Sequence, residues 1–525
     1  MTQEKEAKNI TSGKVYLIGA GPGDPGLFTL KGKEALEKAQ VVIYDRLASS
    51  RVLAFAPSSA EKIYVGKRSG QHAVDQDSIN QLIVDKAKEG KIVARLKGGD
   101  PFIFGRGGEE AQTLRKEGIP FEIVPGITSA IAVPAYAGIP LTHRSYTASV
   151  ALITGHRKFD HDQRADIDWK NLAKGVGTLV FLMGISNLPN IAENLQKFGR
   201  SPDTPVAVIR WGTTPKQRSI SGTLKDIAAK VKEANIKPPA IIVVGDVVKL
   251  KKEINWFESL PLLGKRIVVT RTRSQASTLV KALESLGAEC IELPTIEIKP
   301  PDDLQALDTA IRRAGSYEWI IFSSANAVEH FCSRLLELGL DMRHLGRCGI
   351  AAVGTSTGDA LKKYHIKPDI IPKDFRAEGL LEEFQRLETS IHRILIPRAE
   401  KGREILPEGL KKLGAHVDVV TAYKTVPAQI SEEQIEYLEE APVDLITFTS
   451  SSTAKNFYNL LPEETKAKIL KSAKIASIGP ITSQTCKDLG LVVNIEPETS
   501  TIDDLVNAIK MYYTQNQDEN SMPSL

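Results

Sequence analysis

Short apolar runs alternate with amphipathic segments along nearly the whole chain. Runs of the buried-strand type, rich in Val, Ile and Leu, occupy 15–20, 41–45, 92–96, 178–183, 205–209 and 240–245. Apolar residues at helical spacing predict helices over 29–39, 76–89 and 108–117. This alternation of strands and helices predicts α/β domains with largely parallel sheets.

The alternation stops between Leu250 and Leu263, and a new strand begins at Lys265. We therefore expect a linker over 251–263 that separates two domains, at about 14–250 and 264–512. A chain of 525 residues has room for about two to four domains. The polar segment 513–525 has the composition of a disordered tail.

The second half contains an internal duplication. KRIVVTR at 265–271 is echoed by HRILIPR at 392–398, and IIFSSANAVEHF at 320–331 by ITFTSSSTAKNF at 446–457. IAAVGTSTGDAL at 350–361 is echoed by IASIGPITSQTC at 475–486. The offsets of 127, 126 and 125 residues keep one order along the chain, which predicts two similar α/β lobes facing a cleft.

Composition narrows the function classes. The 68 basic and 64 acidic residues leave a net charge of +4, too balanced to indicate a nucleic-acid partner. The polar N-terminus has no apolar core of a signal peptide, and no apolar run reaches the roughly 18 residues of a membrane span. The four cysteines have no paired spacing, which favours reduced thiols and the cytoplasm.

The first strand ends in the glycine-rich segment GAGPGDPG, at 19–26. A glycine-rich turn after a strand is typical of dinucleotide sites, and Asp45 follows Gly21 by 24 residues, near the position of a ribose-binding acid. Two features oppose that interpretation. Pro22 removes a backbone N–H from the loop, and a second glycine-rich loop, 95–110, is left unexplained. Two such loops favour a ligand without phosphate, such as S-adenosylmethionine, although a nicotinamide cofactor stays open.

A larger set of motifs supports this interpretation. VYLIGAGPGDPGLFTL, YDRL, VGKR, RLKGGDPFIFGRGGEE, VPGITSA, AGIPLTHR, ITGH and PPAIIVVGDVV follow one another over 14–250. Together they resemble the uroporphyrinogen-III C-methyltransferase family. The resemblance implies a tetrapyrrole-methylase fold of two α/β subdomains, near 14–145 and 146–250, and a homodimer formed through this half. It also implies S-adenosylmethionine as methyl donor and S-adenosylhomocysteine as product.

The resemblance also assigns roles to residues at matching motif positions. Asp45 would accept a proton and Lys67 would donate one. The cofactor pocket would be lined by Pro22, Gly98, Gly99, Asp100, Ile103, Thr128, Ser129, Met183 and Gly212. Two places depart from the family pattern. Ser129 stands where alanine is usual. The segment RWGT at 210–213 stands where a sequence similar to ENGT is common, which puts the contacts at 210–213 in doubt.

The chemistry of methyl transfer fits these residue types. Moving a sulfonium methyl group to a pyrrole carbon builds positive charge on the macrocycle, which a carboxylate such as Asp45 can stabilise or relieve of a proton. The substrate carries eight carboxylates, and arginine recognises them well. Substrate-binding candidates are Arg68, Arg106 and Arg144, with Arg95, Lys97, His143, His156 and Arg157 beside them. No residues stand at metal-ligand spacing, so we expect no metal.

The second half has hydroxyl- and glycine-rich turns after its strands, at 323–326, 354–357, 450–453 and 479–482. Helix N-termini in such turns bind anions. From these residues alone, an enzyme and a non-catalytic, two-lobed ligand-binding module both stay open.

The segments VVTRTR, LPTIEI, FSSANAV, AVGTSTGDAL, LIPRAEKGREILPEGL, TAYKTVP, FTSSSTAKNF and SIGPITSQT span 264–512. They are similar to uroporphyrinogen-III synthase. The similarity implies a bilobal α/β fold with duplicated lobes, 264–293 plus 428–512 and 299–418, joined by two crossings. Tyr423 would assist the departure of a hydroxyl group, and Thr355, Ser451 and Thr482 would bind carboxylates.

The two resemblances together imply a bifunctional tetrapyrrole enzyme. It would cyclise hydroxymethylbilane to uroporphyrinogen III, with inversion of ring D, and then methylate C2 and C7 to give precorrin-2. The alternatives are a nicotinamide-dependent oxidoreductase in the first half and a ligand-binding module in the second. No nucleic acid or membrane is expected as a partner.

Overall fold

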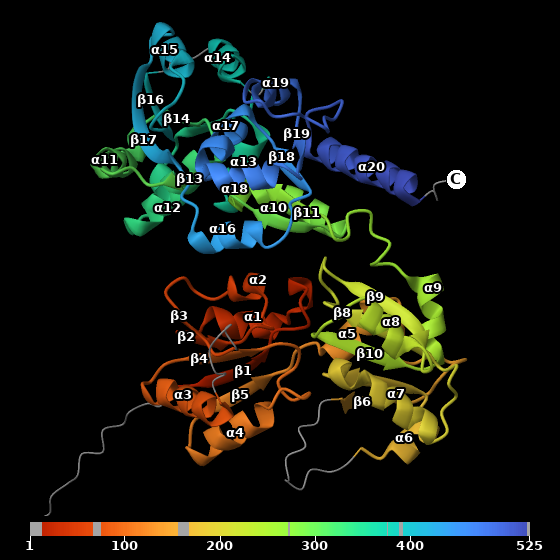
Figure 1. The fold of residues 1–525 in the computed structure, drawn as a ribbon. Coiled ribbons are helices and arrows are strands. Elements are labelled where there is room, and N and C mark those ends of the chain that lie inside the picture. Colours follow the sequence, from red (N-terminus) through yellow and green to blue (C-terminus); the bar gives the residue numbers. More distant parts are fainter. Residues whose placement is uncertain are drawn as a thin grey trace, which may run out of the picture. The chain divides into compact units, whose positions relative to one another are not determined.

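The computed structural model describes residues 13–66, 75–155, 167–270, 273–374, 376–387 and 392–521 (Figure 1). The chain forms two compact units, the first mainly from residues up to Lys265 and the second mainly from Arg266 to Tyr512. Among the described residues, no helix has both the length and the apolar character that crossing a bilayer requires.

The first unit opens with a parallel five-stranded sheet in the order β3-β2-β4-β1-β5. Its strands are β1 Val15–Gly19, β2 Val41–Tyr44, β3 Glu61–Tyr64, β4 Val93–Lys97 and β5 Phe121–Val124. The predicted strands at 15–20, 41–45 and 92–96 are confirmed to within a residue at each end. All five residues of β4 are buried, as expected for a central strand with both faces covered.

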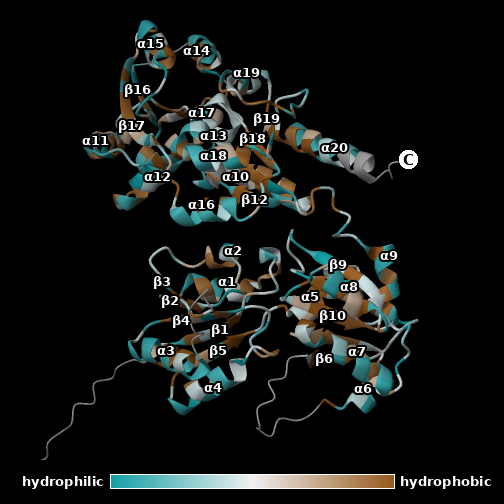
Figure 2. Ribbon diagram, viewed as in Figure 1, coloured by the Kyte–Doolittle hydropathy of each residue, from teal (hydrophilic) through white to brown (hydrophobic). Residues whose placement is uncertain are grey.

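Helices cover both faces of this sheet. They are α1 Leu30–Glu37, α2 Ser50–Leu53, α3 Gln76–Lys88 and α4 Gly107–Lys116, and a further helix, α5 Ser129–Tyr136, follows β5. Apolar residues of α3 and α4 pack on one face, and those of α1 and α2 pack on the other (Figure 1). Figure 2 shows the central strands in hydrophobic colours and the helices with mixed faces, the pattern that the sequence predicts.

A second five-stranded sheet follows, in the order β6-β7-β10-β8-β9. Its strands are β6 Val150–Thr154, β7 Thr178–Leu182, β8 Pro205–Arg210, β9 Arg218–Thr223 and β10 Ala240–Val244. Its helices are α6 Trp169–Gly175, α7 Leu188–Lys197, α8 Ile227–Glu233 and α9 Lys251–Ile254. Helices α6 to α8 pack on one face, whereas α5 of the preceding subdomain packs on the other.

The prediction of parallel strands is wrong for most of this second sheet. Only β6 and β7 are parallel, and β10 runs antiparallel to both β7 and β8. Strands β8 and β9 are also antiparallel and are joined by the short segment 211–217. A parallel pair needs a crossover of a dozen or more residues, so this segment is too short for one.

The second unit contains two sheets, in the orders β12-β11-β18-β19 and β13-β17-β16-β14-β15. The first has β11 Arg266–Val269, β12 Glu289–Glu292, β18 Leu445–Phe448 and β19 Lys474–Ser477. The second has β13 Ile296–Lys299, β14 Trp319–Phe322, β15 Gly349–Ala352, β16 Arg393–Ala399 and β17 His416–Pro427.

Helices flank both sheets of this unit. Those around the first sheet are α10 Arg273–Ser285, α16 Glu432–Glu439, α17 Ser451–Leu460, α18 Glu463–Leu470 and α19 Pro480–Asp488. Those around the second are α11 Gln305–Arg312, α12 Ala325–Glu337, α13 Thr355–Lys363, α14 Ala377–Gln385 and α15 Ile405–Lys412.

The echoed segments occupy equivalent places in the two sheets. Strands β11, β18 and β19 are neighbours in that order, and their echoes β16, β14 and β15 are neighbours in the same order. The helices that follow are paired in the same way, α12 with α13 and α17 with α19. The duplication is therefore a βα arrangement that occurs twice, and each sheet takes strands from both copies. Strand β11 of the first copy joins β18 and β19 of the second, and β16 of the second copy joins β14 and β15 of the first.

The pairing of β13 with β17 and the last helix, α20, complete the fold of this unit. Strand β13 lies antiparallel to the end of β17, from Ile296 opposite Pro427 to Lys299 opposite Lys424. These two stretches fall where the chain is expected to cross between the lobes, and they lie side by side. The last helix, α20 Ile502–Ser521, continues through most of the segment for which the sequence predicts disorder. Its buried residues Leu505, Ile509 and Tyr513 recur at helical spacing, and the helix propagates beyond them.

Candidate active sites

The two glycine-rich loops of the first unit follow β1 and β4 and are joined by backbone hydrogen bonds. The Gly21 amide donates to the Gly99 carbonyl at 3.2 Å, and the Gly99 amide donates to the Gly21 carbonyl at 2.7 Å. Both residues have positive φ, 76° and 69°, which glycine adopts readily. Because these two amides already have partners, they cannot cradle a pyrophosphate, which argues against the dinucleotide interpretation.

Asp100 fixes the second of these loops. Its Oδ1 accepts a hydrogen bond from the Phe102 amide at 2.7 Å, and its Oδ2 accepts one from the Gly126 amide at 3.0 Å. Gly126 lies in the loop after β5, which leads to the helix cap Thr128 and to Ser129 at the start of α5. Asp100 therefore holds the loops after β4 and β5 together.

Gly126 packs so closely that alanine does not fit. A Cβ at this position would lie 2.3 Å from the Gly99 carbonyl oxygen. We expect Gly126→Ala to destabilise the first unit by about 1–3 kcal/mol and to weaken S-adenosylhomocysteine binding about tenfold or more, because the Gly98–Gly99 loop must shift. Chemical denaturation and titration calorimetry measure the two effects.

Gly108→Ala is the matched control, because a Cβ at Gly108, in α4, meets no atom of the structure within 4 Å. The control should leave binding unchanged and raise the stability slightly, since alanine favours a helix over glycine. Equal binding losses in the two variants would contradict this account of the loop.

Loops of the second subdomain meet the same region. The Asp24 amide donates to Thr213 Oγ1 at 3.2 Å, and the Tyr136 hydroxyl donates to Asp24 Oδ2 at 2.6 Å. A Cβ on Gly212 would lie 2.4 Å from a methyl group of Val133 in α5. The loop carrying Pro22, the start of the loop after β8 and α5 are thus held together.

The remaining cofactor candidates lie around these loops. A Cβ on Gly99 would lie 3.7 Å from Thr128 Cα and 3.8 Å from Ser129 N. Gly98 is backed by Leu47, which a Cβ would approach to 2.4 Å. The apolar side chains of Ile103 and Met183 are 38% and 53% exposed.

The loops around these candidates contain an unusual backbone feature. Among the described residues, non-glycine residues with positive φ include Phe104 and Arg106 after β4, Met183 after β7, and Trp211 and Thr213 after β8. Such conformations cost free energy and concentrate at functional sites. Sequence patterns contain no signal for them.

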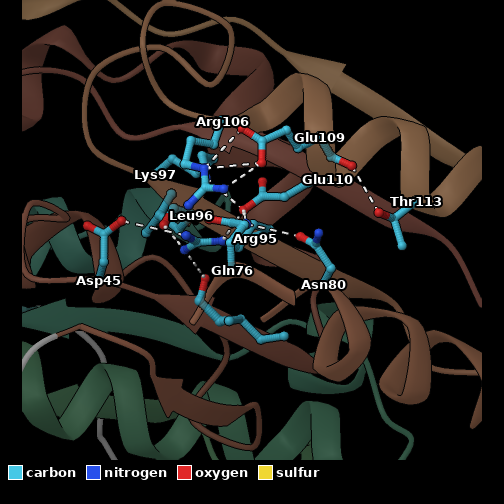
Figure 3. Close-up of polar contacts among 11 residues, drawn as sticks. Asp45, Gln76, Asn80, Arg95, Leu96, Lys97, Arg106, Glu109, Glu110 and Thr113 are labelled. Atoms are coloured by element: carbon cyan, nitrogen blue, oxygen red, sulfur yellow. Dashed lines mark hydrogen bonds and ion pairs between the residues drawn. The ribbon is translucent and has the colours of Figure 1, made fainter. Parts of the chain in front are cut away.

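Asp45 lies directly after β2, at the carboxyl edge of the first sheet. Its Oδ1 accepts a hydrogen bond from the Leu47 amide at 2.9 Å. Its Oδ2 lies 3.7 Å from a terminal nitrogen of Arg95 on the neighbouring strand β4 (Figure 3). The Asp45 side chain is 28% exposed and that of Arg95 only 4%. Asp45 is therefore a partly accessible carboxylate backed by a buried cation.

The interpretation of Arg95 and Lys97 as substrate-binding cations needs correction. Both side chains point into the protein from β4, where they share the Glu110 carboxylate (Figure 3). Burial, followed by the positive charge of Arg95, lowers the pKa of Lys97. Neither cation is placed to receive a substrate carboxylate directly.

Other predicted substrate residues are more accessible. Arg106 caps α4 with φ of 60° and pairs with Glu109 at 2.6 Å, with its side chain 54% exposed. Arg144 is exposed in the loop before β6. Lys67 and Arg68, with His156 and Arg157, lie outside the described residues.

In the second unit, Tyr423 lies on β17 and is 8% exposed. Its hydroxyl is 3.1 Å from Ser324 Oγ, and its ring stacks on His330 with a centroid separation of 5.7 Å. Ser324 caps α12 by accepting from the Ala327 amide. Burial lowers the pKa of His330. The Tyr423 hydroxyl thus lies at a helix N-terminus beside a half-buried imidazole.

Sequence patterns miss both neighbours of Tyr423. Ser324 belongs to a predicted anion-binding turn, but its contact with a residue almost 100 positions away has no local signal. His330 falls within α12, where a helical histidine gives no indication of stacking on β17.

The predicted carboxylate-binding residues of this unit differ in exposure. Thr355 is exposed at the first position of α13. Ser451, at the first position of α17, donates to the Ile481 carbonyl at 3.2 Å and accepts from the Thr485 hydroxyl at 2.8 Å. Thr482 is buried in the first turn of α19. Ser451 is therefore joined to the α19 turn.

Comparison with known families gives two matches in tandem. Residues 14–228 match the family of tetrapyrrole (corrin/porphyrin) methylases, and residues 277–507 match the uroporphyrinogen-III synthase HemD family. The porphyrin biosynthesis protein HemD of Ruminiclostridium josui is 38% identical over 498 residues, 95% of this chain and 97% of that relative.

Further relatives resemble single halves. A uroporphyrinogen-III C-methyltransferase of Priestia megaterium is 56% identical over 237 residues, 45% of this chain and 98% of that relative. A solved Thermus thermophilus uroporphyrin-III C-methyltransferase with S-adenosylhomocysteine is 42% identical, covering 45% of this chain and all of the other, with a TM-score of 0.39. A Thermus thermophilus uroporphyrinogen III synthase mutant is 18% identical, covering 48% and 99%, with a TM-score of 0.34.

The two family matches thus define a tetrapyrrole biosynthesis enzyme with a methyltransferase domain and a synthase domain. The chain belongs to the family of fusions that join a uroporphyrinogen-III C-methyltransferase domain to a HemD-type uroporphyrinogen-III synthase domain.

Proposed function

We propose that this chain catalyses two consecutive reactions. The synthase domain cyclises hydroxymethylbilane to uroporphyrinogen III with inversion of ring D. The methyltransferase domain then transfers methyl groups to C2 and C7, giving precorrin-2. The observation that carries the proposal is the tandem match of both families on one chain, at 14–228 and 277–507, because the product of one domain is the substrate of the other.

The residues around the paired glycine loops fit S-adenosylmethionine. Gly98 and Gly99 offer a backbone surface without side chains, and Ile103 and Met183 offer exposed apolar groups. The Gly21 and Gly99 N–H groups each donate to the carbonyl of the other residue. These residues, with Pro22, Asp100, Thr128, Ser129 and Gly212, would hold the cofactor. When bound, it supplies an electrophilic sulfonium methyl group, and S-adenosylhomocysteine is the product.

The residues of the chain then have to align the substrate and manage charge. Asp45 stabilises the positive charge that develops on the macrocycle and accepts the ring proton, while the Arg95 guanidinium lies behind it on β4. Lys67 is assigned the proton-donor role. We assign the substrate carboxylates to Arg68, Arg106 and Arg144, because a guanidinium group can form two parallel hydrogen bonds to one carboxylate.

In the synthase domain, Tyr423 is assigned to the departure of the hydroxyl group. The phenol donates its proton to the leaving oxygen, and the carbon–oxygen bond breaks. The hydroxyl group departs as water, and a pyrrolic cation remains. Ser324 lies within hydrogen-bonding distance of the phenol and fixes its direction. Thr355, Ser451 and Thr482 are assigned to substrate carboxylates, supported by the N-terminal positions of their helices.

Boundaries, assembly and compartment complete the proposal. We assign the methyltransferase to 14–250, the linker to 251–263 and the synthase to 264–512. A homodimer through the methyltransferase half is supported by the exposed apolar side chains of Phe102 and Phe104. A cytoplasmic location is supported by buried thiols such as Cys332, whose pKa burial raises to about 12.

One incubation of the purified full chain tests the proposed function. With hydroxymethylbilane and S-adenosylmethionine, the expected product is precorrin-2. Without S-adenosylmethionine, uroporphyrinogen III should accumulate. Failure to form uroporphyrinogen III would overturn the synthase assignment, and uroporphyrinogen III that stays unmethylated with the cofactor present would overturn the methyltransferase assignment.

A further inference from the structure

Glu110 is a fully buried carboxylate in the first turn of α4, and one of its oxygens receives every polar contact. Its Oε1 accepts from Arg95 Nε at 3.1 Å, from Lys97 Nζ at 2.7 Å and from Gln76 Nε2 at 3.2 Å (Figure 3). Within the described part of the chain, its Oε2 is buried with no hydrogen-bond partner. Burying these charges costs free energy that an apolar core would avoid.

The contacts of Arg95 show what this arrangement achieves. One terminal nitrogen donates to the carbonyls of Ile43 and Leu96, at 3.4 and 3.1 Å, and Nε is held by Glu110. The other terminal nitrogen is left 3.7 Å from Asp45 Oδ2. Because the guanidinium is planar, Glu110 and the two carbonyls together fix the direction in which Arg95 faces Asp45.

The charges in this cluster balance. Arg95 and Lys97 contribute two positive charges, and Asp45 and Glu110 contribute two negative charges. The neighbouring groups from α3, Gln76 and Asn80, are neutral and hydrogen-bonded to each other at 3.0 Å. Arg106, at the start of α4, pairs with Glu109 and also interacts electrostatically with Glu110 and with Asp77 of α3. Loss of any one of these four charges therefore leaves the cluster with a net charge.

We propose that Glu110 is a positioning residue for methyl transfer, which orients Arg95 toward Asp45 and, with Lys97, sets the charge that Asp45 experiences. The inference rests on the proposed role of Asp45 in methylation. Glu110 does not touch the substrate. Its effect reaches the reaction through Arg95.

Glu110→Gln tests the inference in the full chain. We expect kcat for methyl transfer to fall about tenfold, with little change in KM for S-adenosylmethionine. Ring closure by the same preparation should be unchanged.

Glu117→Gln is the matched control. It makes the same chemical change at the other end of α4 and breaks the ion pair of Glu117 with Lys88 at 2.7 Å. It should keep the wild-type kcat and KM. A control that shifts as much as Glu110→Gln would overturn the inference.

Lys97→Met, and the double variant that combines Lys97→Met with Glu110→Gln, keep the inference testable if Glu110→Gln alone does not fold. Lys97→Met alone should also lower kcat for methyl transfer, and the double variant, with balanced charge, should lose less activity than the two single effects combined. A purely structural role for Glu110 predicts losses of activity that follow the folded fraction of each variant and add in the double variant, and that result would overturn the inference. Absence of methylation by the wild-type chain would instead overturn the proposed function.

Discussion

Replacement of Asp45 by asparagine is expected to lower the rate of methyl transfer about a hundredfold or more while ring closure continues. Asparagine keeps an oxygen that can accept from the Leu47 amide, so the loop after β2 should hold its shape. It loses the negative charge that faces Arg95 and the ability to accept a proton. General base catalysis contributes about 10²–10⁴-fold, which sets the expected size.

The measurement is the product distribution from hydroxymethylbilane with S-adenosylmethionine. Uroporphyrinogen III should accumulate in place of precorrin-2. Asp203→Asn makes the same change at an exposed position before β8 and should behave as the wild type. If Asp45→Asn lost both activities while remaining folded, the assignment of Asp45 to methylation alone would fail.

Replacement of Tyr423 by phenylalanine is expected to have the opposite effect. Ring closure should slow about a hundredfold, because the phenol that protonates the leaving oxygen is removed while the ring keeps its place against His330. Methylation of added uroporphyrinogen III should continue at the wild-type rate. Initial rates of the two reactions, measured separately on one preparation, give the comparison.

Tyr364→Phe is the control for this experiment. Tyr364 ends α13 in the same unit, and its hydroxyl contacts Ser333 Oγ at 3.2 Å, much as Tyr423 contacts Ser324 at 3.1 Å. The two variants therefore lose the same kind of hydrogen bond, but only Tyr423 is assigned to the reaction. Equal slowing of ring closure by both would remove the support for a catalytic phenol.

The repeating elements of the fold are predictable because they depend on local periodicity. The strand at 92–96 and the helix at 76–89 are found as β4 and α3, within a residue of the expected ends. The echoes in the second half predict the equivalence of β11, β18 and β19 with β16, β14 and β15. The antiparallel pairing of β8 and β9 is not predicted, because β9 has no buried residue and no apolar run marks it in the sequence.

The candidate sites were predictable where a motif lies on one loop. Asp45 and the glycines of the paired loops belong to such motifs, and the structure places Asp45 and the paired loops at the ends of strands in one sheet. Arg95 and Lys97 were misread because cations usually face solvent, whereas β4 is covered on both faces. A sequence cue did exist, since alternate residues of one strand point to the same side.

Glu110 shows the limit of such reasoning. Its neighbour Glu109 is exposed and Glu110 is fully buried, although the two carboxylates are adjacent in GGEE. Helical spacing places Glu110 on the buried stripe with Ala111 and Leu114. That pattern alone does not show that Glu110 pairs with two cations of β4, because only the fold brings these residues together.

A crystal structure of the full chain with S-adenosylhomocysteine tests the central claim most directly, namely that the paired glycine loops beside Asp45 form the methyl-donor site. The account predicts the ligand against Gly98 and Gly99, with its sulfur directed toward the side of the sheet where Asp45 lies. A ligand bound elsewhere, or a nucleotide whose phosphates occupy these loops in its place, would contradict it.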